Sequence, residues 1–243
     1  MKILAIEASG PVAGCALLED DLLIADYNVQ YKKKHSQSLV PMLDEIRRML
    51  ELDMKTVDAI AIAKGPGSFT GLRIGAATAK GIGLAVDRPI IPVPTVDSIA
   101  YNLYAVDGLI CPLMDARRQQ VYTGIYEWQQ TQFSVLREQC VIPAAEIAAD
   151  LNARGRAVVF LGDGVPVYKD ILAELMTVPY SFAPPHLARQ RAAAVASLAY
   201  SCWERQGESC MVSVDDFRPE YLRLAQAEQE HSERRNFSLL LDV

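Results

Sequence analysis

The amino-acid sequence predicts an α/β protein with two lobes, each built from a mixed sheet packed with helices. The first observation is the order of the expected elements, because three strands, a helix, a strand and a helix follow one another in both halves of the chain. The second is an apolar run at 57–63, which is typical of a strand buried on both faces. The third is size and composition, because 243 residues with 51% hydrophobic side chains suffice for one large or two small domains.

Three strands and a helix are expected before this run. The strands are predicted at 3–7, 12–18 and 22–29, with turns between them. The helix is predicted from about Ser36 to Leu50, with Pro41 in its first turn. Its apolar stripe consists of Leu39, Leu43, Ile46 and Leu50, widened by Val40, Met42 and Met49. A stripe that broad can cover the helix's own sheet and leave apolar surface for a neighbour.

The stretch 64–85 predicts a strand end, a glycine turn and a second helix, from Ser68 or Thr70 to about Ala85. Small residues recur every four positions on one side of this helix: Gly71, Gly75, Ala79 and Gly83. A glycine inside a helix costs about 0.5–1 kcal/mol relative to alanine, so the stripe indicates the close approach of another backbone. Two interpretations stay open: the helix is buried in its own domain, or part of its surface pairs with another chain.

The glycine turn could also bind a phosphate, as many turns between a strand and a helix do. However, Thr70 stands where G-x-G-x-x-G requires its third glycine, and Leu72 with Arg73 follow Gly71 where a P-loop requires Lys and Ser or Thr. Phosphate binding here is therefore the weaker interpretation.

The second half repeats the order of elements without repeating the sequence. The expected elements are a strand at 90–93, a helix at 95–104, strands at 109–115, 120–128 and 133–141, a helix at 143–151, a strand at 157–161, and helices at 165–176 and 188–206. We therefore predict a first lobe at 1–106, a second lobe at 107–224 whose last helix can pack back on the first, and a polar tail at 225–243.

Charge and cysteine usage restrict the class of protein. The net charge is −6 and the basic clusters are short, so strong RNA binding by the isolated chain is not expected. The five cysteines lack a C-x-x-C pattern, and the three histidines (His35, His186 and His231) lack zinc-binding spacing. With no apolar run of ~20 residues and no signal-peptide pattern, we expect a cytoplasmic protein without membrane contact.

Five motifs resemble the bacterial TsaB (YeaZ) family. The longest is GPGSFTGLRIG at Gly65–Gly75; the others are ILAIEAS at 3–9, HSQSLVPML at 35–43, MDARRQQVY at 114–122 and RPEYLR at 218–223. The resemblance implies the actin/Hsp70/sugar-kinase superfold. It also implies a role in placing the threonylcarbamoyl group on the adenosine beside the tRNA anticodon.

The resemblance further implies a subunit with no catalytic residues, no cofactor and no metal of its own. Its expected partners are the TsaD catalytic subunit and the TsaE ATPase, with tRNA bound only through the complex. Pairing would use the two helices of the first lobe. Because an exposed apolar patch tends to be covered, we also expect a homodimer through the same surface when the chain is alone. The predicted interface residues are Leu39, Leu43, Ile46, Leu50, Gly71, Leu72, Ile74, Gly75, Thr78, Ala79 and Ile82.

The nucleotide site of the superfold is only partly matched. Active members resemble one another in an aspartate at the end of the first strand, where this chain has Glu7. They also have a glycine-containing phosphate hairpin, where this chain has DARRQQ at 115–120. The weak candidates for nucleotide contact are Glu7, Asp115, Gly162 and Gly164, and Asp115 is more simply a structural hydrogen-bonding group. His35 is most simply a helix-terminal residue, with a partner contact as the alternative. An active ATP-dependent kinase or ATPase remains the alternative function.

Overall fold

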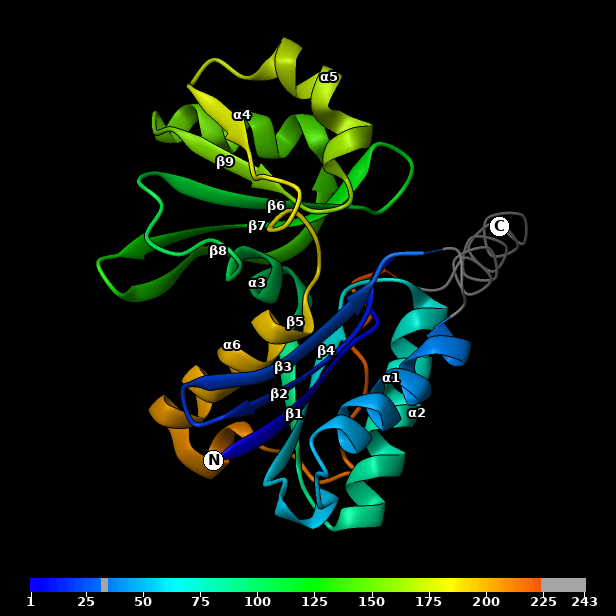
Figure 1. The fold of residues 1–243 in the computed structure, drawn as a ribbon. Helices are drawn as coiled ribbons and strands as arrows, with labels where there is room; N and C mark the ends of the chain where they lie inside the picture. The colour runs from blue at the N-terminus through cyan, green and yellow to red at the C-terminus, as the bar shows by residue number, and fades with distance from the viewer. Residues whose placement is uncertain (32–34, 224–243) are drawn as a thin grey trace, which may run out of the picture.

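The computed structural model describes residues 1–31 and 35–223, and Figure 1 shows them as two lobes. The first sheet has the strand order β3-β2-β1-β4-β5. Its strands are β1 (Lys2–Glu7), β2 (Ala13–Glu19), β3 (Leu22–Val29), β4 (Ala59–Gly65) and β5 (Ile90–Pro94). Strand β1 pairs antiparallel with β2 and parallel with β4, so the sheet is mixed.

The second sheet repeats this arrangement with the order β10-β9-β6-β7-β8. Its strands are β6 (Leu109–Asp115), β7 (Gln120–Gln129), β8 (Gln132–Pro143), β9 (Val158–Leu161) and β10 (Tyr180–Phe182). Strand β6 pairs antiparallel with β7 and parallel with β9, as β1 does with β2 and β4. The predicted fold class, two lobes each with a mixed sheet packed with helices, is confirmed.

Alternation along β1 distributes its side chains between two helical layers. Leu4 and Ile6 contact the layer formed by α1 (His35–Met49) and α2 (Phe69–Val86). Ile3 and Ala5 face the other side, where α6 (Ala192–Gln206) packs. Because both faces are covered, the strand is apolar at every position from Ile3 to Ile6.

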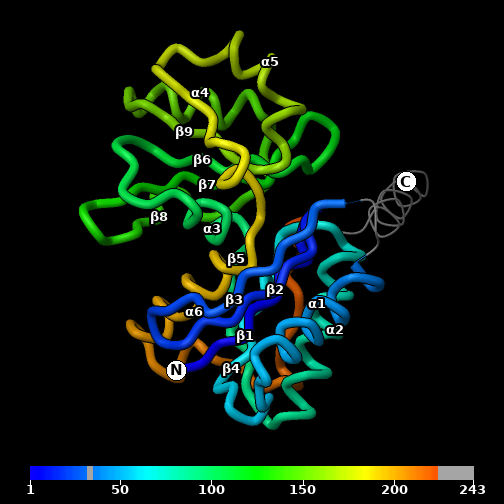
Figure 2. Tube along the Cα trace, viewed as in Figure 1, coloured from blue at the N-terminus to red at the C-terminus, as the bar shows by residue number. Residues whose placement is uncertain are grey.

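The second lobe is covered in the same way. Helices α4 (Ala144–Arg154) and α5 (Val165–Leu175) cover one face of its sheet, and the short α3 (Thr95–Ala100) packs on the other. The chain then returns to the first lobe between β10 and α6, which is the yellow segment in Figure 2.

Several boundaries differ from those predicted. The helix expected at 95–104 ends at Ala100, because turns follow immediately. The helix expected at 188–206 begins at Ala192, since Arg191 is extended with φ −142°. Strand β10 was not predicted, since three residues give no readable alternation.

The polar tail predicted at 225–243 lies outside the described residues. Among the described helices, none combines the length and apolar character that crossing a membrane requires.

Candidate functional site

The small-residue stripe of α2 faces the protein's own first lobe. A Cβ placed on Gly71 would lie 2.1 Å from the carbonyl oxygen of Ala8, and one on Gly75 would lie 3.1 Å from the Ala8 Cβ. Ala79 is fully buried, and a Cβ on Gly83 would lie 2.9 Å from Val214 Cγ2. The close backbone approach indicated by the sequence is therefore real, but its partner is the segment that follows β1. For this stripe, the interpretation of a helix buried in its own domain is correct.

This burial corrects the predicted set of interface residues. Six of the predicted residues are buried in the core of the first lobe: Leu39, Ile46, Gly71, Leu72, Gly75 and Ala79. The physical reason is that both helices pack on β1, β2 and β4 through the faces that carry these residues. Ile46 nevertheless lines the groove between α1 and α2 that is described below. The other five remain partly or largely accessible: Leu43, Leu50, Ile74, Thr78 and Ile82.

An apolar groove lies between α1 and α2, with a volume of about 380 Å³. Leu43, Thr78 and Ile82 line it, as the sequence analysis expected of accessible interface positions. Val40, Ala77 and Gly81 line it as well and were not predicted as interface residues. Gly81 could have been found from the sequence, because it is a helix glycine that lies off the four-residue stripe. A Cβ on Gly81 would meet nothing within 4 Å, so this glycine serves no contact inside the lobe.

A second depression, the interlobe cleft, has a volume of about 670 Å³. It brings together the glycine turn before α2, the β6–β7 hairpin and the segment 221–223. Two of the weak nucleotide candidates, Gly162 and Gly164, lie against β6 behind this cleft: a Cβ on either would lie within 2.8 Å of the Leu113 carbonyl oxygen. Their role here is a tight turn between β9 and α5.

Asp115 lines the interlobe cleft but is engaged in local structure. Its Oδ1 accepts hydrogen bonds from the Tyr168 hydroxyl at 2.9 Å and from the Arg117 backbone N–H at 2.8 Å. The bond from Tyr168 holds the β6–β7 hairpin against α5, and the bond from Arg117 lies within the hairpin. The structure therefore favours the interpretation of Asp115 as a structural hydrogen-bonding group.

Glu7 is fully buried at the end of β1. Its Oε1 accepts hydrogen bonds from the Ser9 backbone N–H at 2.6 Å and from the Ser9 hydroxyl, while its Oε2 has no partner among the described residues. Burial raises the pKa of Glu7 to about 7. A carboxyl group this enclosed is poorly placed to reach a ligand in the interlobe cleft.

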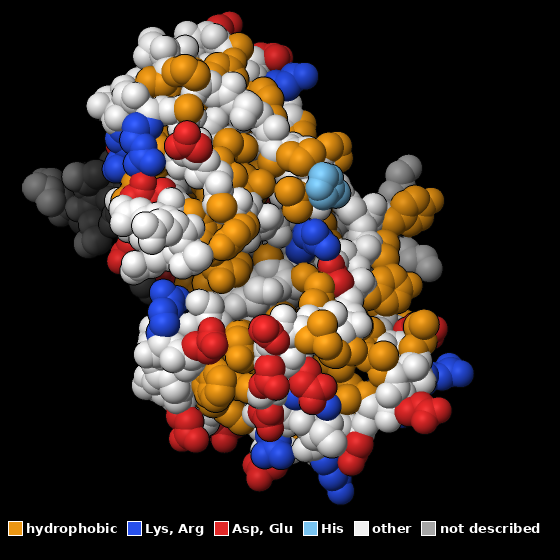
Figure 3. Space-filling view, turned by 60° about the vertical axis from the view of Figure 1, so that its left-hand side comes forward, with side chains coloured by type: hydrophobic (Ala, Val, Ile, Leu, Met, Phe, Trp, Pro, Cys, Tyr) orange, Lys and Arg blue, Asp and Glu red, His pale blue; other side chains and the backbone are white. Residues whose placement is uncertain are grey.

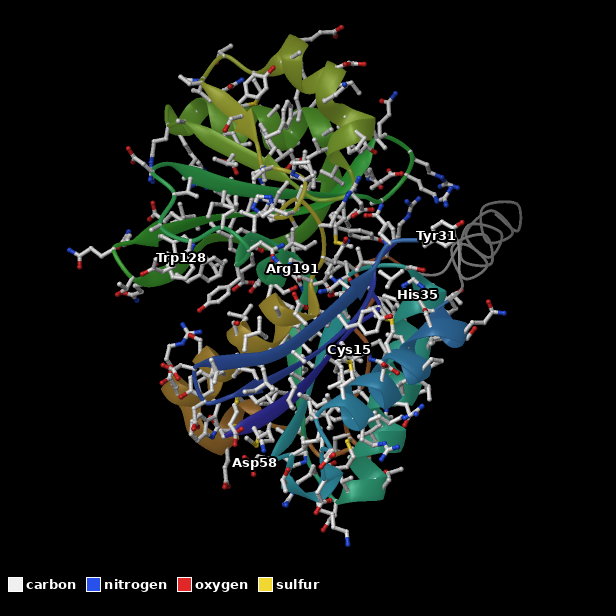
Figure 4. The ribbon with its side chains drawn as sticks, in the orientation of Figure 1. Cys15, Tyr31, His35, Asp58, Trp128 and Arg191 are labelled. Atoms are coloured by element: carbon white, nitrogen blue, oxygen red, sulfur yellow. The ribbon has the colours of Figure 1, made fainter. Side chains whose placement is uncertain are left out.

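His35 and Arg191 hold segments around the strands of the first lobe (Figure 4). The His35 Nε2–H, at the start of α1, donates to the carbonyl oxygens of Gly10 and Val12 at 2.9 and 3.1 Å. Arg191 precedes α6 and pairs with Asp26 of β3 at 2.6 Å. These contacts give His35 a structural role at a helix terminus.

The family model, the related sequences and the solved structure that match this chain agree with one another. The family model of TsaD, the tRNA N6-adenosine threonylcarbamoyltransferase, matches residues 29–231. The tRNA threonylcarbamoyladenosine biosynthesis protein TsaB of Bacillus subtilis is 35% identical over 94% of this chain and 96% of that protein. TsaB of Escherichia coli is 32% identical over 52% of this chain, and the alignment spans 55% of the E. coli protein. The solved structure of YeaZ from Pseudomonas aeruginosa superimposes with a TM-score of 0.77 at 28% identity, covering 91% of this chain and 99% of that one.

Proposed function

Because the chain belongs to the TsaB family and so has a role in the biosynthesis of threonylcarbamoyladenosine in tRNA, we propose that it acts as a non-catalytic subunit that pairs with a TsaD-type catalytic subunit. The observation that carries this proposal is the apolar groove between α1 and α2. In this proposal a TsaE-type ATPase joins the assembly, tRNA binds to the assembly in the cytoplasm, and a homodimer forms through the same groove when the partner is absent.

The groove has the chemistry of a helix-pairing surface. Val40, which lines the groove, is 60% exposed, and the same two helices also expose Met49 (75%) and Leu84 (65%). Exposed apolar surface of this kind marks interaction sites in soluble proteins. Two small, exposed residues of α2, Ala77 and Gly81, line the groove, so a partner helix can approach α2 closely there and bury the larger side chains around it.

The residues in and around the interlobe cleft support the proposal that the chain itself is not catalytic. Glu7, at the position of the superfold's aspartate, is enclosed in the core. The β6–β7 hairpin places Arg117 and Arg118 where active relatives have glycine for close backbone approach to phosphate. We therefore assign the chemistry to the partner subunit.

The first prediction is that Ala77→Arg abolishes pairing and leaves the fold intact. Ala77 is exposed and lines the groove, so the new charge would be buried unpaired only in the complex. We expect affinity to fall by roughly 100-fold, or about 3 kcal/mol. Affinity capture after co-expression with a TsaD-type subunit measures this, and the modified nucleoside should be lost in a reconstituted reaction.

Ala153→Arg is the matched control, because Ala153 is an exposed helix residue of α4 in the second lobe and lies outside the groove. It makes the same change of charge and size and should pair normally. If both variants are captured equally well, pairing does not use the groove and the proposal is wrong.

The second prediction tests the alternative function, an active ATP-dependent kinase or ATPase. Calorimetry and phosphate-release measurements with magnesium-ATP on the isolated chain should show no turnover, because the carboxyl group of Glu7 is buried and its Oε1 is occupied by Ser9. Micromolar binding with turnover would instead favour an active kinase or ATPase.

A further inference from the structure

Three arginines line the interlobe cleft. Arg117 and Arg118 occupy the tip of the β6–β7 hairpin, and Arg223 approaches from the other side and donates to the Ala116 carbonyl oxygen. Within the described residues, none of the three has a carboxylate at ion-pair distance. On the face shown in Figure 3, acidic side chains are numerous over the first lobe, as a net charge of −6 predicts. The arginines are thus a local cationic site on an acidic protein.

An accessible aromatic pair stands beside these arginines. Phe69, at the start of α2, and Tyr221 both line the interlobe cleft, and their ring centroids are 5.2 Å apart. Each of the two residues is 38% exposed. The Arg73 guanidinium lies 3.9 Å from the Phe69 ring centroid, which adds a fourth cation to the aromatic surface.

The acidic groups of the interlobe cleft are occupied by the protein itself. Asp115 accepts from Tyr168 and from the Arg117 backbone, and Asp163 accepts from Gln190 Nε2 at 2.9 Å. The two carboxylates therefore reduce, but do not cancel, the attraction between the arginine guanidinium groups and a bound anion.

We propose that the arginine and aromatic side chains of the interlobe cleft form a contact surface for single-stranded RNA, which the chain contributes to the tRNA-modifying assembly. This inference rests on the proposed function and names the part of this chain that would contact the RNA. Arginines bind phosphates of a flexible backbone, and exposed rings stack on unpaired bases, so the combination fits a single-stranded loop. A mononucleotide fits less well, because the hairpin offers bulky side chains in place of a backbone amide cradle.

The test measures binding of a synthetic anticodon stem–loop RNA to the full chain by fluorescence anisotropy as salt is raised. At ~50 mM salt we expect weak binding, with a Kd of about 10–100 μM, consistent with a small number of phosphate contacts. Arg117→Gln combined with Arg118→Gln should weaken binding by at least about tenfold and reduce the salt slope by roughly 1.4, the contribution of two phosphates on a single strand. Tyr221→Leu should weaken binding by about tenfold and leave the salt slope unchanged.

The control variant combines Arg48→Gln with Lys169→Gln, which removes two exposed charges that do not line the interlobe cleft. It should keep most of the affinity. Equal loss in the two double variants, or no binding at ~50 mM salt, overturns the inference. Displacement of the RNA by an equimolar mononucleotide also overturns it, because the site would then be a nucleotide site.

Capture by a TsaD-type subunit separates this inference from the proposed function. The Arg117 and Arg118 variant should pair normally while losing RNA, and Ala77→Arg should bind RNA normally while losing its partner. If the chain binds RNA but does not pair with the TsaD-type subunit, this inference holds and the proposed function is wrong. If the chain pairs but does not bind RNA, the proposed function holds and this inference is wrong.

Discussion

Gly71→Leu is expected to lower the free energy of unfolding by about 3 kcal/mol or more, which is enough to unfold many domains of ordinary stability. The ideal Cβ at this position lies 2.1 Å from the Ala8 carbonyl oxygen, and a backbone atom cannot swing aside as a side chain can. Helix α2 would have to lift from β1, which would also expose Ala76 and Ala79. Urea unfolding followed by circular dichroism measures the effect.

Gly81→Ala in the same helix is the matched comparison. A Cβ at Gly81 meets nothing within 4 Å, so only the gain in helix propensity remains, and stability should rise by about 0.5–1 kcal/mol. If Gly71→Leu were as stable as Gly81→Ala, α2 would not be seated on the segment after β1. The assignment of the two faces of this helix would then be wrong.

The two glycines show what the sequence could reveal about α2 and what it could not. Spacing alone placed Gly71, Gly75 and Ala79 on one side of a helix and indicated a close backbone approach, which the structure confirms. Spacing could not say which backbone approaches, because a strand of the same lobe and a helix of another chain require the same absence of side chains. The position of β1 in the folded lobe determines which backbone approaches the stripe. It leaves Ala77 and Gly81, which lie outside the stripe, at the surface.

The fold was more predictable than the sites. Element order and buried apolar runs sufficed for both lobes, because each strand and helix leaves its own local pattern. The interlobe cleft leaves no such pattern, since Phe69, Arg117 and Tyr221 are far apart in sequence and meet only when the lobes are assembled. The sequence could identify Glu7 as the end of β1, but its complete enclosure depends on the surrounding layers.

That enclosure leads to a pH dependence whose sign is opposite to that of most carboxyl groups. Burial raises the pKa of Glu7 from 4.5 to about 7, so the folded protein holds this proton more tightly than the unfolded chain does. The stabilisation from Glu7 is fully present below pH 4.5 and is lost as pH rises towards 7. A shift of this size corresponds to about 3 kcal/mol, since each pH unit is worth about 1.4 kcal/mol.

Glu7→Gln should remove this contribution and reduce the pH dependence of the free energy of unfolding between about 5 and 7. Burial also raises the pKa values of Asp97 and Asp163, so all three groups contribute to the pH dependence of the wild-type protein. The difference in pH dependence between Glu7→Gln and the wild type isolates the contribution of Glu7. Glu174→Gln, on the exposed side of α5, is the control and should keep the wild-type slope. If Glu7→Gln kept that slope too, the Glu7 carboxyl group would have to be hydrated in the folded protein. The interlobe cleft would then extend to the end of β1, and the position of the superfold's aspartate would again be open to a ligand.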